Sequence, residues 1–193
     1  GVANSTVYGG VAGDVMGADI RTMGALRDPC PNALQAEIDR ALHPLTRQPA
    51  PVHPLRVALQ EAMWDDVGVM RTATGMERAL TRLAEISEAL MNVGVAGDNL
   101  AFNLTWHDWL NLRSLCDVSE VITLAGLARE NSRGAHYRED FPDEGDLDAS
   151  YFTVVTQRGD DLTVRRDPVQ FTIIRPGETI LPDNEPETLV AAQ

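Results

Sequence analysis

The sequence predicts a mainly α-helical protein: a three-helix antiparallel bundle with a small C-terminal β hairpin and strand region. Three long segments, residues 54–71, 74–95 and 105–132, repeat apolar residues at the spacing that gathers them on one face of a helix. After residue 142 the chain changes to short β-branched stretches separated by turn residues. Antiparallel helices of such length bury their apolar faces by packing together.

The first 53 residues precede this bundle and are rich in small residues and proline. Residues 1–8 are expected to be extended or looped, and residues 9–28 to form a helix that Gly9 and Gly10 open. Residues 29–53 are expected to be a linker. It contains a short helix at 32–42 with Asn32 as the N-cap, followed by a proline-rich loop.

The bundle domain is expected to span residues 54–142, and each helix has its own boundary signals. Pro54 suits the first turn of the first helix, and glycines follow the second. Thr105 followed by Asp108 resembles a capping box at the start of the third helix. Gly134 is read as the residue that follows the end of this helix.

Residues 143–193 are expected to form a β extension and a polar tail. Residues 151–157 and 162–166 predict a hairpin around a turn at 158–161, and residues 169–174 predict a further strand. The tail at 182–193 is polar and proline-rich.

Composition excludes several classes of function. The 193-residue chain has a net charge of −13, which argues against nucleic acid and anionic lipid as partners. No apolar run approaches the ~20 residues that span a bilayer, so no direct membrane insertion is expected. Neither a signal peptide nor a disulfide framework is visible, which predicts a cytoplasmic location. All sixteen basic residues are arginine, which excludes a lysine Schiff base and pyridoxal-phosphate chemistry.

The first candidate site is the segment ARENSRGAHYREDFP, residues 128–142, which gathers four cationic or titratable side chains: Arg129, Arg133, His136 and Arg138. A turn that presents these groups together could hold a carboxylate or a phosphate. They could equally pair with nearby acids of the same chain, while Arg129 and Arg133 complement the dipole of the preceding helix. Both interpretations are open from the residues alone.

The second candidate is the segment YGGVAGDVMG, residues 8–17. Glycines at a helix start expose backbone N–H groups that suit an anionic or electron-rich ligand, although tight backbone packing explains them equally well.

The acidic pair Asp65–Asp66 is a weaker candidate. Neighbouring helical residues point about 100° apart, so the two carboxyls cannot share a proton. The expectation is instead that Met63 and Trp64 lie in the core and that Arg71 bonds acids or carbonyls near the helix end. The histidines lack the spacing of a metal site.

These motifs resemble a known family. The order M-W-x-x-V-G-x-x-R, then G-M-x-x-A-L, then R-E-x-S-R-G-A-H-x-R-x-D-F-P is similar to the C-terminal region of succinate dehydrogenase/fumarate reductase flavoprotein subunits and of L-aspartate oxidase. The stretch DPVQFT near the end also resembles this family. The resemblance extends over residues 52–175.

For the N-terminus, the resemblance implies that residues 1–28 are the last helix of a flavin-binding domain. It places Gly9, Gly10, Val11 and Ala12 against the flavin of FAD. The chain departs from the family pattern at two positions. Val7 stands where the family has an arginine that holds a substrate carboxylate, and Val11 stands where it has an asparagine. This departure leaves the dicarboxylate substrate open.

In this family the FAD-binding and capping domains precede the matched region. The resemblance therefore implies the C-terminal helical domain of an FAD-dependent oxidoreductase, which supports dicarboxylate-type redox chemistry carried out by domains outside this chain. No catalytic residue and no activity of the isolated chain are expected.

The implied partners are an FAD-binding domain or subunit, together with an iron–sulfur subunit. The resemblance gives Arg129, Arg133, His136 and Arg138 a docking role. The alternatives are a non-catalytic assembly subunit of a split flavoprotein and the C-terminal domain of an L-aspartate oxidase.

Overall fold

The computed structural model describes residues 2–25, 27–97, 99–159 and 161–179. The chain divides into two compact units, with the division between Leu42 and His43. The first unit holds two helices, and the second holds the bundle and the strands.

In the first unit, helix α1 spans Val2–Thr22 and buries none of its residues. The expectation that residues 1–8 are extended and that a helix opens at Gly9 is therefore wrong. Gly9 and Gly10 lie inside a helix that begins about two turns earlier. Interior glycine costs only about 1 kcal/mol relative to alanine, so it does not by itself start or stop a helix.

Helix α2 spans Pro31–Leu42, close to the predicted 32–42. The N-cap position predicted for Asn32 is wrong, because the Leu34 N–H donates to the Cys30 carbonyl at 3.0 Å and the helix already includes Pro31. Proline is favoured at the first helical position because it has no N–H to satisfy.

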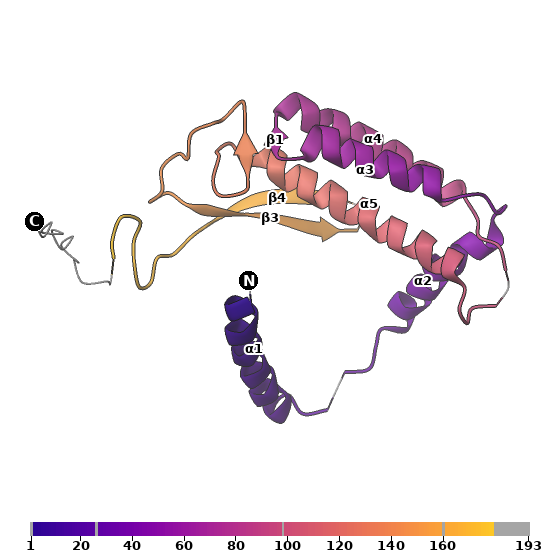
Figure 1. The fold of residues 1–193 in the computed structure, drawn as a ribbon. Coiled ribbons are helices and arrows are strands. Elements are labelled where there is room, and N and C mark those ends of the chain that lie inside the picture. Colours follow the sequence, from indigo (N-terminus) through magenta and orange to yellow (C-terminus); the bar gives the residue numbers. More distant parts are fainter. Residues whose placement is uncertain (1, 26, 98, 160, 180–193) are drawn as a thin grey trace, which may run out of the picture. The chain divides into compact units, whose positions relative to one another are not determined.

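The second unit confirms the predicted fold class of a mainly helical chain with a small β region. After a 3₁₀ turn, η1, at His43–Thr46 come the three long helices, which lie side by side (Figure 1). Helix α3 spans His53–Val67, α4 spans Ala73–Asn92 and α5 spans Leu104–Ala128. The α5 N-cap is Asn103, whose side chain accepts the Trp106 N–H at 3.0 Å, so the capping box predicted at Thr105 is wrong.

One core cluster lies among these helices and the loops at their ends. Its buried members are Val52, Leu59, Leu83, Ile86, Leu90, Val95, Trp109, Leu112 and Cys116. The Trp109 indole N–H donates to the carbonyls of Leu90 and Val93 at 3.1 and 3.0 Å. The largest core side chain of α5 thus also bonds carbonyls at the C-terminus of α4, where the helix leaves carbonyls without N–H partners four residues on.

The proline-rich loop is anchored against the far end of α4. The N–H of Gly94 donates to the Gln48 carbonyl at 2.9 Å, and the N–H of Ala50 donates to the Gly94 carbonyl at 3.2 Å. A Cβ atom at Gly94 would lie 2.1 Å from the Arg47 carbonyl oxygen. Only glycine lets the two backbones approach this closely.

The outer part of α3 differs from the expectation. Trp64 is 80% exposed, so its predicted place in the core is wrong. Asp66 instead faces inward and is only 3% exposed. Its carboxylate accepts hydrogen bonds from two arginines of α4, at 3.1 Å from both Arg78 Nε and Arg82 Nη1. Asp66 lies four residues after buried Ala62, so it continues the inner face of the helix.

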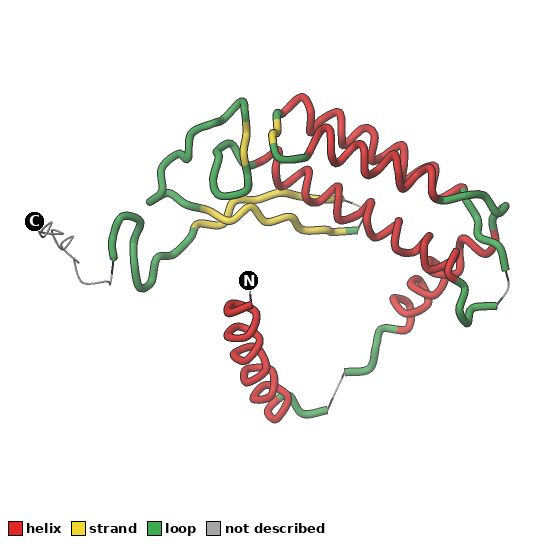
Figure 2. Tube along the Cα trace, in the orientation of Figure 1, coloured by secondary structure: helices red, strands yellow, loops and turns green. Residues whose placement is uncertain are grey.

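Two small sheets complete the unit (Figure 2). Strand β1, Met70–Arg71, pairs in parallel with β2, Tyr137–Arg138. Strands β3, Tyr151–Arg158, and β4, Asp161–Pro168, form the predicted antiparallel hairpin. The strand predicted at 169–174 is wrong, since that segment has no strand partner among the described residues. The predicted polar tail at 182–193 lies outside the described residues.

Replacement of Asp66 by alanine should lower the free energy of unfolding by about 2–4 kcal/mol, because it leaves two arginines without their shared buried acceptor. Urea unfolding followed by the helical circular dichroism signal measures this change. The matched control is Asp65→Ala, which removes the neighbouring exposed carboxylate and should change stability by less than about 0.5 kcal/mol. Equal effects of the two substitutions would contradict the buried role of Asp66.

Candidate functional site

The segment 129–142 folds back over the end of α5. That helix ends at Ala128, so the prediction that it continues to residue 132 is wrong. Gly134, at φ +57°, lies in a tight turn in which Arg133 and His136 exchange backbone hydrogen bonds of 2.9 and 3.0 Å. The left-handed conformation of Gly134 thus reverses the chain instead of ending the helix. The returning chain then pairs with β1, where the Glu139 N–H donates to the Arg71 carbonyl at 2.9 Å.

Arg138 is the central side chain of this segment and is only 1% exposed. Its Nη1 donates to the carbonyls of Gly126, Leu127 and Arg129 at 3.0, 3.0 and 3.2 Å. Carbonyls in the last turn of a helix have no partner within the helix. A buried guanidinium therefore caps α5 and places positive charge at the negative end of its dipole.

The same guanidinium connects two helices through Asp140. Arg138 Nε and Nη2 donate to the two oxygens of the Asp140 carboxylate at 2.7 and 2.8 Å. Asp140 also accepts the Ala73 N–H at 2.8 Å, in the first turn of α4. The hydrogen bonds from Arg138 are the main reason why the pKa of Asp140 lies well below its usual range. The C-terminus of α5 and the N-terminus of α4 thus share one ion pair.

Ser132 holds the turn in shape, and its role was not predicted from the sequence. Its buried hydroxyl accepts the Arg138 N–H at 2.8 Å and donates to the Phe141 carbonyl at 2.8 Å. The serine of the S-R-G-A-H motif was the available signal, because a small hydroxyl residue beside a turn commonly bonds the backbone.

Arg133 points to the following loop. Its guanidinium donates to the carbonyls of Glu144 and Asp146 at 2.6 and 2.8 Å and to the Ser150 hydroxyl at 2.7 Å. These three bonds fix residues 144–150 just before β3. The expected pairing with an acid of the same chain, one of the two interpretations left open, thus holds for Arg138, whereas Arg133 bonds backbone carbonyls and a hydroxyl.

His136 lies between two arginines. Its Nδ1 is 2.8 Å from Arg71 Nη1, and its Nε2 is 3.2 Å from the Arg129 carbonyl oxygen. An arginine can only donate, so Nδ1 is the acceptor and Nε2 carries the proton. Burial lowers the pKa of His136, and the charges of Arg71, Arg129 and Arg138 lower it further. The imidazole is therefore neutral at physiological pH.

Arg71 and Arg129 complete the cluster. Arg71 Nε donates to the carbonyls of Val67 and Gly68 at 3.1 and 2.8 Å, which confirms the expectation that it bonds groups near the helix end. Arg129 donates through Nε to Asn131 at 3.0 Å. The structure thus brings Arg129, His136 and Arg138 together with Arg71, while Arg133 is directed toward the neighbouring loop.

Gly9, Gly10, Val11 and Ala12 belong to the other unit, inside α1. A side chain built at Gly9 or Gly10 would meet nothing within 4 Å, so a flat ring could approach this backbone closely. Their N–H groups lie in the helix interior, where each bonds the carbonyl four residues earlier. In this conformation the four residues offer no free N–H groups, contrary to the expectation that the glycines expose donors at a helix start.

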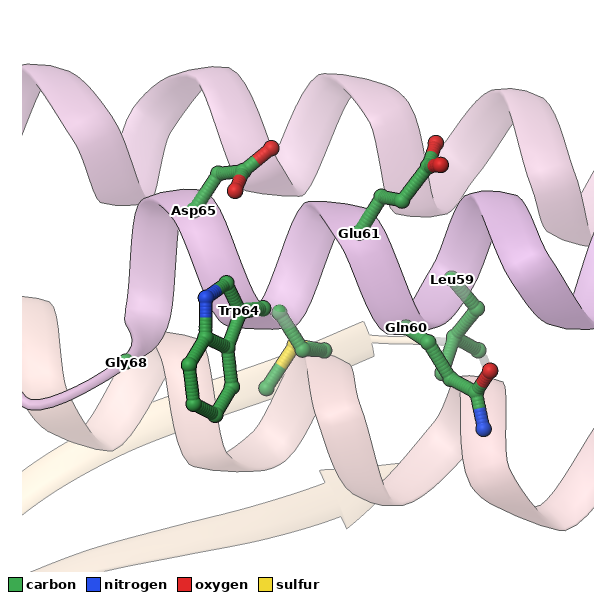
Figure 3. Close-up of a pocket in the computed structure, with 7 residues that line it drawn as sticks. Leu59, Gln60, Glu61, Trp64, Asp65 and Gly68 are labelled. Atoms are coloured by element: carbon green, nitrogen blue, oxygen red, sulfur yellow. The ribbon is translucent and has the colours of Figure 1, made fainter.

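A second surface feature lies along α3, where a shallow groove of about 610 Å³ is lined mainly by Leu59, Met63, Trp64 and Gly68. Glu61 and Asp65 project on one side of the helix, and Gln60 and Trp64 on the other (Figure 3). The groove is apolar and brings no nucleophile and base together. Among the described residues there is no cluster of potential metal ligands. No helix in the described part of the chain is long and apolar enough to cross a bilayer.

Replacement of Arg138 by alanine should lower the free energy of unfolding by about 3–5 kcal/mol. The carbonyls at the end of α5 would lose their buried hydrogen-bond donor, and the Asp140 carboxylate would lose its ion pair. Chemical denaturation measures this effect. Arg165→Ala is the matched control, since Arg165 forms the same two-bond pair with an aspartate two residues later, but on the surface. The control should have a much smaller effect, because ion pairs on the surface contribute little to stability. A small effect at Arg138 would refute the capping role.

Stability should also decrease in mild acid because of His136. The unfolded chain binds a proton near the ordinary pKa of 6.5, whereas the folded protein resists protonation. The free energy of unfolding should therefore fall as the pH is lowered from about 7 to 5. His136→Gln should flatten this dependence, and His107→Gln, at an exposed position, should leave it intact. Urea titrations at several pH values test this, and identical slopes in both variants would count against it.

Comparison with known proteins identifies the family. The family model described as the fumarate reductase flavoprotein C-terminal region matches residues 56–181, more than half of the chain. This range includes the bundle and the segment 129–142, so the resemblance found in the sequence motifs is confirmed.

Curated relatives agree with this match. The chain is 31% identical over 127 residues to the fumarate reductase flavoprotein subunit of Mycobacterium tuberculosis, which is 65% of this chain and 22% of the relative. It is 32% identical over 94 residues to the succinate dehydrogenase flavoprotein subunit of Rickettsia conorii, 49% of this chain and 16% of the relative. An L-aspartate oxidase of Yersinia pestis is 38% identical over 82 residues, 42% of this chain and 14% of the relative. The chain thus matches less than a quarter of the length of these relatives.

Solved structures show the same architecture. Mycobacterium smegmatis Sdh1, solved in complex with UQ1, aligns with a TM-score of 0.72 and 28% identity over 82% of this chain and 28% of its own. The E. coli quinol fumarate reductase chain FrdA aligns with a TM-score of 0.68 over 79% of this chain and 27% of its own; its 22% identity shows the fold alone. Together with the family model, these matches show that the chain belongs to the family of C-terminal domains of succinate dehydrogenase/fumarate reductase flavoproteins.

Proposed function

We propose that this chain supports an FAD-dependent oxidoreductase of the succinate dehydrogenase/fumarate reductase class, in which FAD-binding and capping domains perform the redox step on a dicarboxylate-type substrate. The observation that supports this proposal is that the arginines of the segment 129–142 form hydrogen bonds within the domain. Arg138 binds the α5 carbonyls and Asp140, and Arg133 binds the following loop. These groups are engaged in holding the domain together, which suits a rigid support and not a reaction centre.

FAD is the cofactor in this proposal, and it would supply the acceptor for hydride when bound. Gly9, Gly10, Val11 and Ala12 would contact its ring, because the two glycines carry no side chain and all four residues are exposed on α1. The relatives described as flavoprotein subunits support this assignment. The residues of this chain would shield the ring from water and fix its position.

The proposed partners are an FAD-binding domain or subunit, with a second contact to an iron–sulfur subunit. The docking role of Arg129, Arg133, His136 and Arg138 remains part of this proposal in a modified form. Their internal hydrogen bonds fix the conformation of the turn. The surface of this turn would then contact the FAD-binding domain or subunit. Of the nitrogens of the Arg129 guanidinium, only Nε has a hydrogen-bond partner among the described residues, so Arg129 has the most N–H donors left for a docking partner.

A non-catalytic assembly subunit of a split flavoprotein is the second candidate. It is favoured by Val7 and Val11, which replace the arginine and asparagine expected beside the flavin and the substrate and are both exposed. The C-terminal domain of an L-aspartate oxidase is a third candidate, favoured by the Yersinia pestis relative.

A visible absorption spectrum of the purified chain, alone and with added FAD, separates the first two candidates. If the glycine face contacts flavin, the band near ~450 nm should shift and saturate as FAD is added. Gly10→Leu should weaken this binding, because a bulky side chain would occupy the bare face. Gly17→Leu is the matched control, since it adds the same side chain about two turns further along α1.

A spectrum identical to that of free FAD would contradict the flavin-facing role and favour the assembly role. Equal weakening by both leucine substitutions would show that binding reports the integrity of the helix and not contact at Gly10.

A further inference from the structure

A groove of about 370 Å³ lies between α5 and the hairpin, where β3 runs beside the helix (Figure 1). One wall is a single face of α5 that ends at Arg129, and the other wall is Phe152 and Thr153 of β3. Arg71 and His136 form the end of the groove. Three elements far apart in the sequence therefore bring two arginines and an imidazole to one concave surface.

The two arginines of this groove have no carboxylate partner among the residues that the structure describes. Neighbouring arginines do have one: Arg138 pairs with Asp140, and Arg166 pairs with Glu130. Asp140 and Glu130 are thus engaged by other arginines and do not pair with Arg71 or Arg129. The chain has a net charge of −13, yet these two guanidinium groups have no carboxylate partner at this surface among the described residues. They form a local positive site that attracts an anion.

The arginine at the end of the groove is held in a fixed position. Arg71 donates through Nε to two carbonyls and through Nη1 to His136, which leaves Nη2 free of such bonds in the described structure. The imidazole accepts this bond only in its neutral form, so it adds no charge that would repel Arg71. A guanidinium held in this way loses little conformational freedom when a ligand binds.

The rest of the groove is apolar with one polar exception. Ile122 and Ala125 of α5 face Phe152, which is 61% exposed at the rim. The Thr153 hydroxyl is buried and has no hydrogen-bond partner within the described residues. Buried hydroxyls without partners are uncommon in native proteins, and this one belongs to a residue that lines the groove. The groove therefore combines positive charge at one end with an apolar surface along its length.

We propose that this groove binds a carboxylate carried on a short apolar chain, with Arg129 and Arg71 donating to its oxygens and Phe152 and Ile122 covering the apolar part. Charge-assisted hydrogen bonds from guanidinium groups are the strongest that a carboxylate accepts in proteins. The same chemistry is available from a free short-chain carboxylate and from an aspartate or glutamate side chain of another polypeptide. The site does not depend on the proposed flavoprotein role.

The test is an NMR titration of the chain in which the Nε–Hε signals of Arg129 and Arg71 are followed. Butyrate represents the free carboxylate, and acetyl-glutamate amide represents a protein side chain. Butyramide, which has the shape of butyrate without its charge, is the ligand control. Both carboxylates should shift the two arginine signals saturably, and butyramide should not. Tighter binding of butyrate indicates a free ligand, and tighter binding of acetyl-glutamate amide indicates a partner's side chain.

Two variants locate the binding. Arg129→Gln should weaken it about tenfold, since it removes a charged donor. Arg158→Gln makes the same change at an exposed position outside the groove and should have no effect. Phe152→Ser alters the exposed rim and should weaken binding a few-fold, which provides a second readout if Arg129→Gln fails to fold. Absence of a saturable shift, or equal weakening by Arg129→Gln and Arg158→Gln, would overturn the proposal.

Discussion

The buried guanidinium of Arg138 is the interaction on which the arrangement of the second unit depends. It completes the last turn of α5, and through Asp140 it reaches the first turn of α4. A buried charge loses its hydrogen bonds to water and needs other partners. Arg138 bonds carbonyls and the Asp140 carboxylate instead, and these groups also need partners. The folding back of residues 129–142 follows from this requirement. The positions of Arg133, His136 and Arg129 follow in turn, because all three lie on the chain that Arg138 anchors.

The groove beside α5 is a consequence of the same geometry. Arg138 bonds the carbonyls at the end of α5, while His136 and Arg71 bond each other and line the groove together with Phe152 and Thr153 of the hairpin. Arg71 and Arg129 line this groove, and neither has a carboxylate partner among the described residues. The family match assigns the chain to flavoprotein C-terminal domains, and nothing in that match concerns the charge of this groove.

Local patterns predicted the elements well and the contacts between them less well. Helical spacing identified α3, α4 and α5, because their packed faces impose the repeat directly. It misplaced Trp64, because an acidic residue such as Asp66 is not expected on an inner face unless it is paired, and its partners Arg78 and Arg82 lie on another helix. The cationic segment 129–142 was visible as a motif, and its pairing with the chain's own acids was one of two open interpretations. The hydrogen bond between Arg71 and His136 could not be predicted, because the two residues lie 65 positions apart. A contact between residues so far apart produces no repeating pattern in the sequence.

This long separation also bears on how the protein folds. The bundle is built from consecutive helices, so most of its packing closes short loops and can form early. The contacts of Ala73 with Asp140 and of Arg71 with His136 close loops of 67 and 65 residues, which costs more chain entropy. The turn at 129–142 is therefore expected to form after the bundle, because its contacts need the helix ends already brought together.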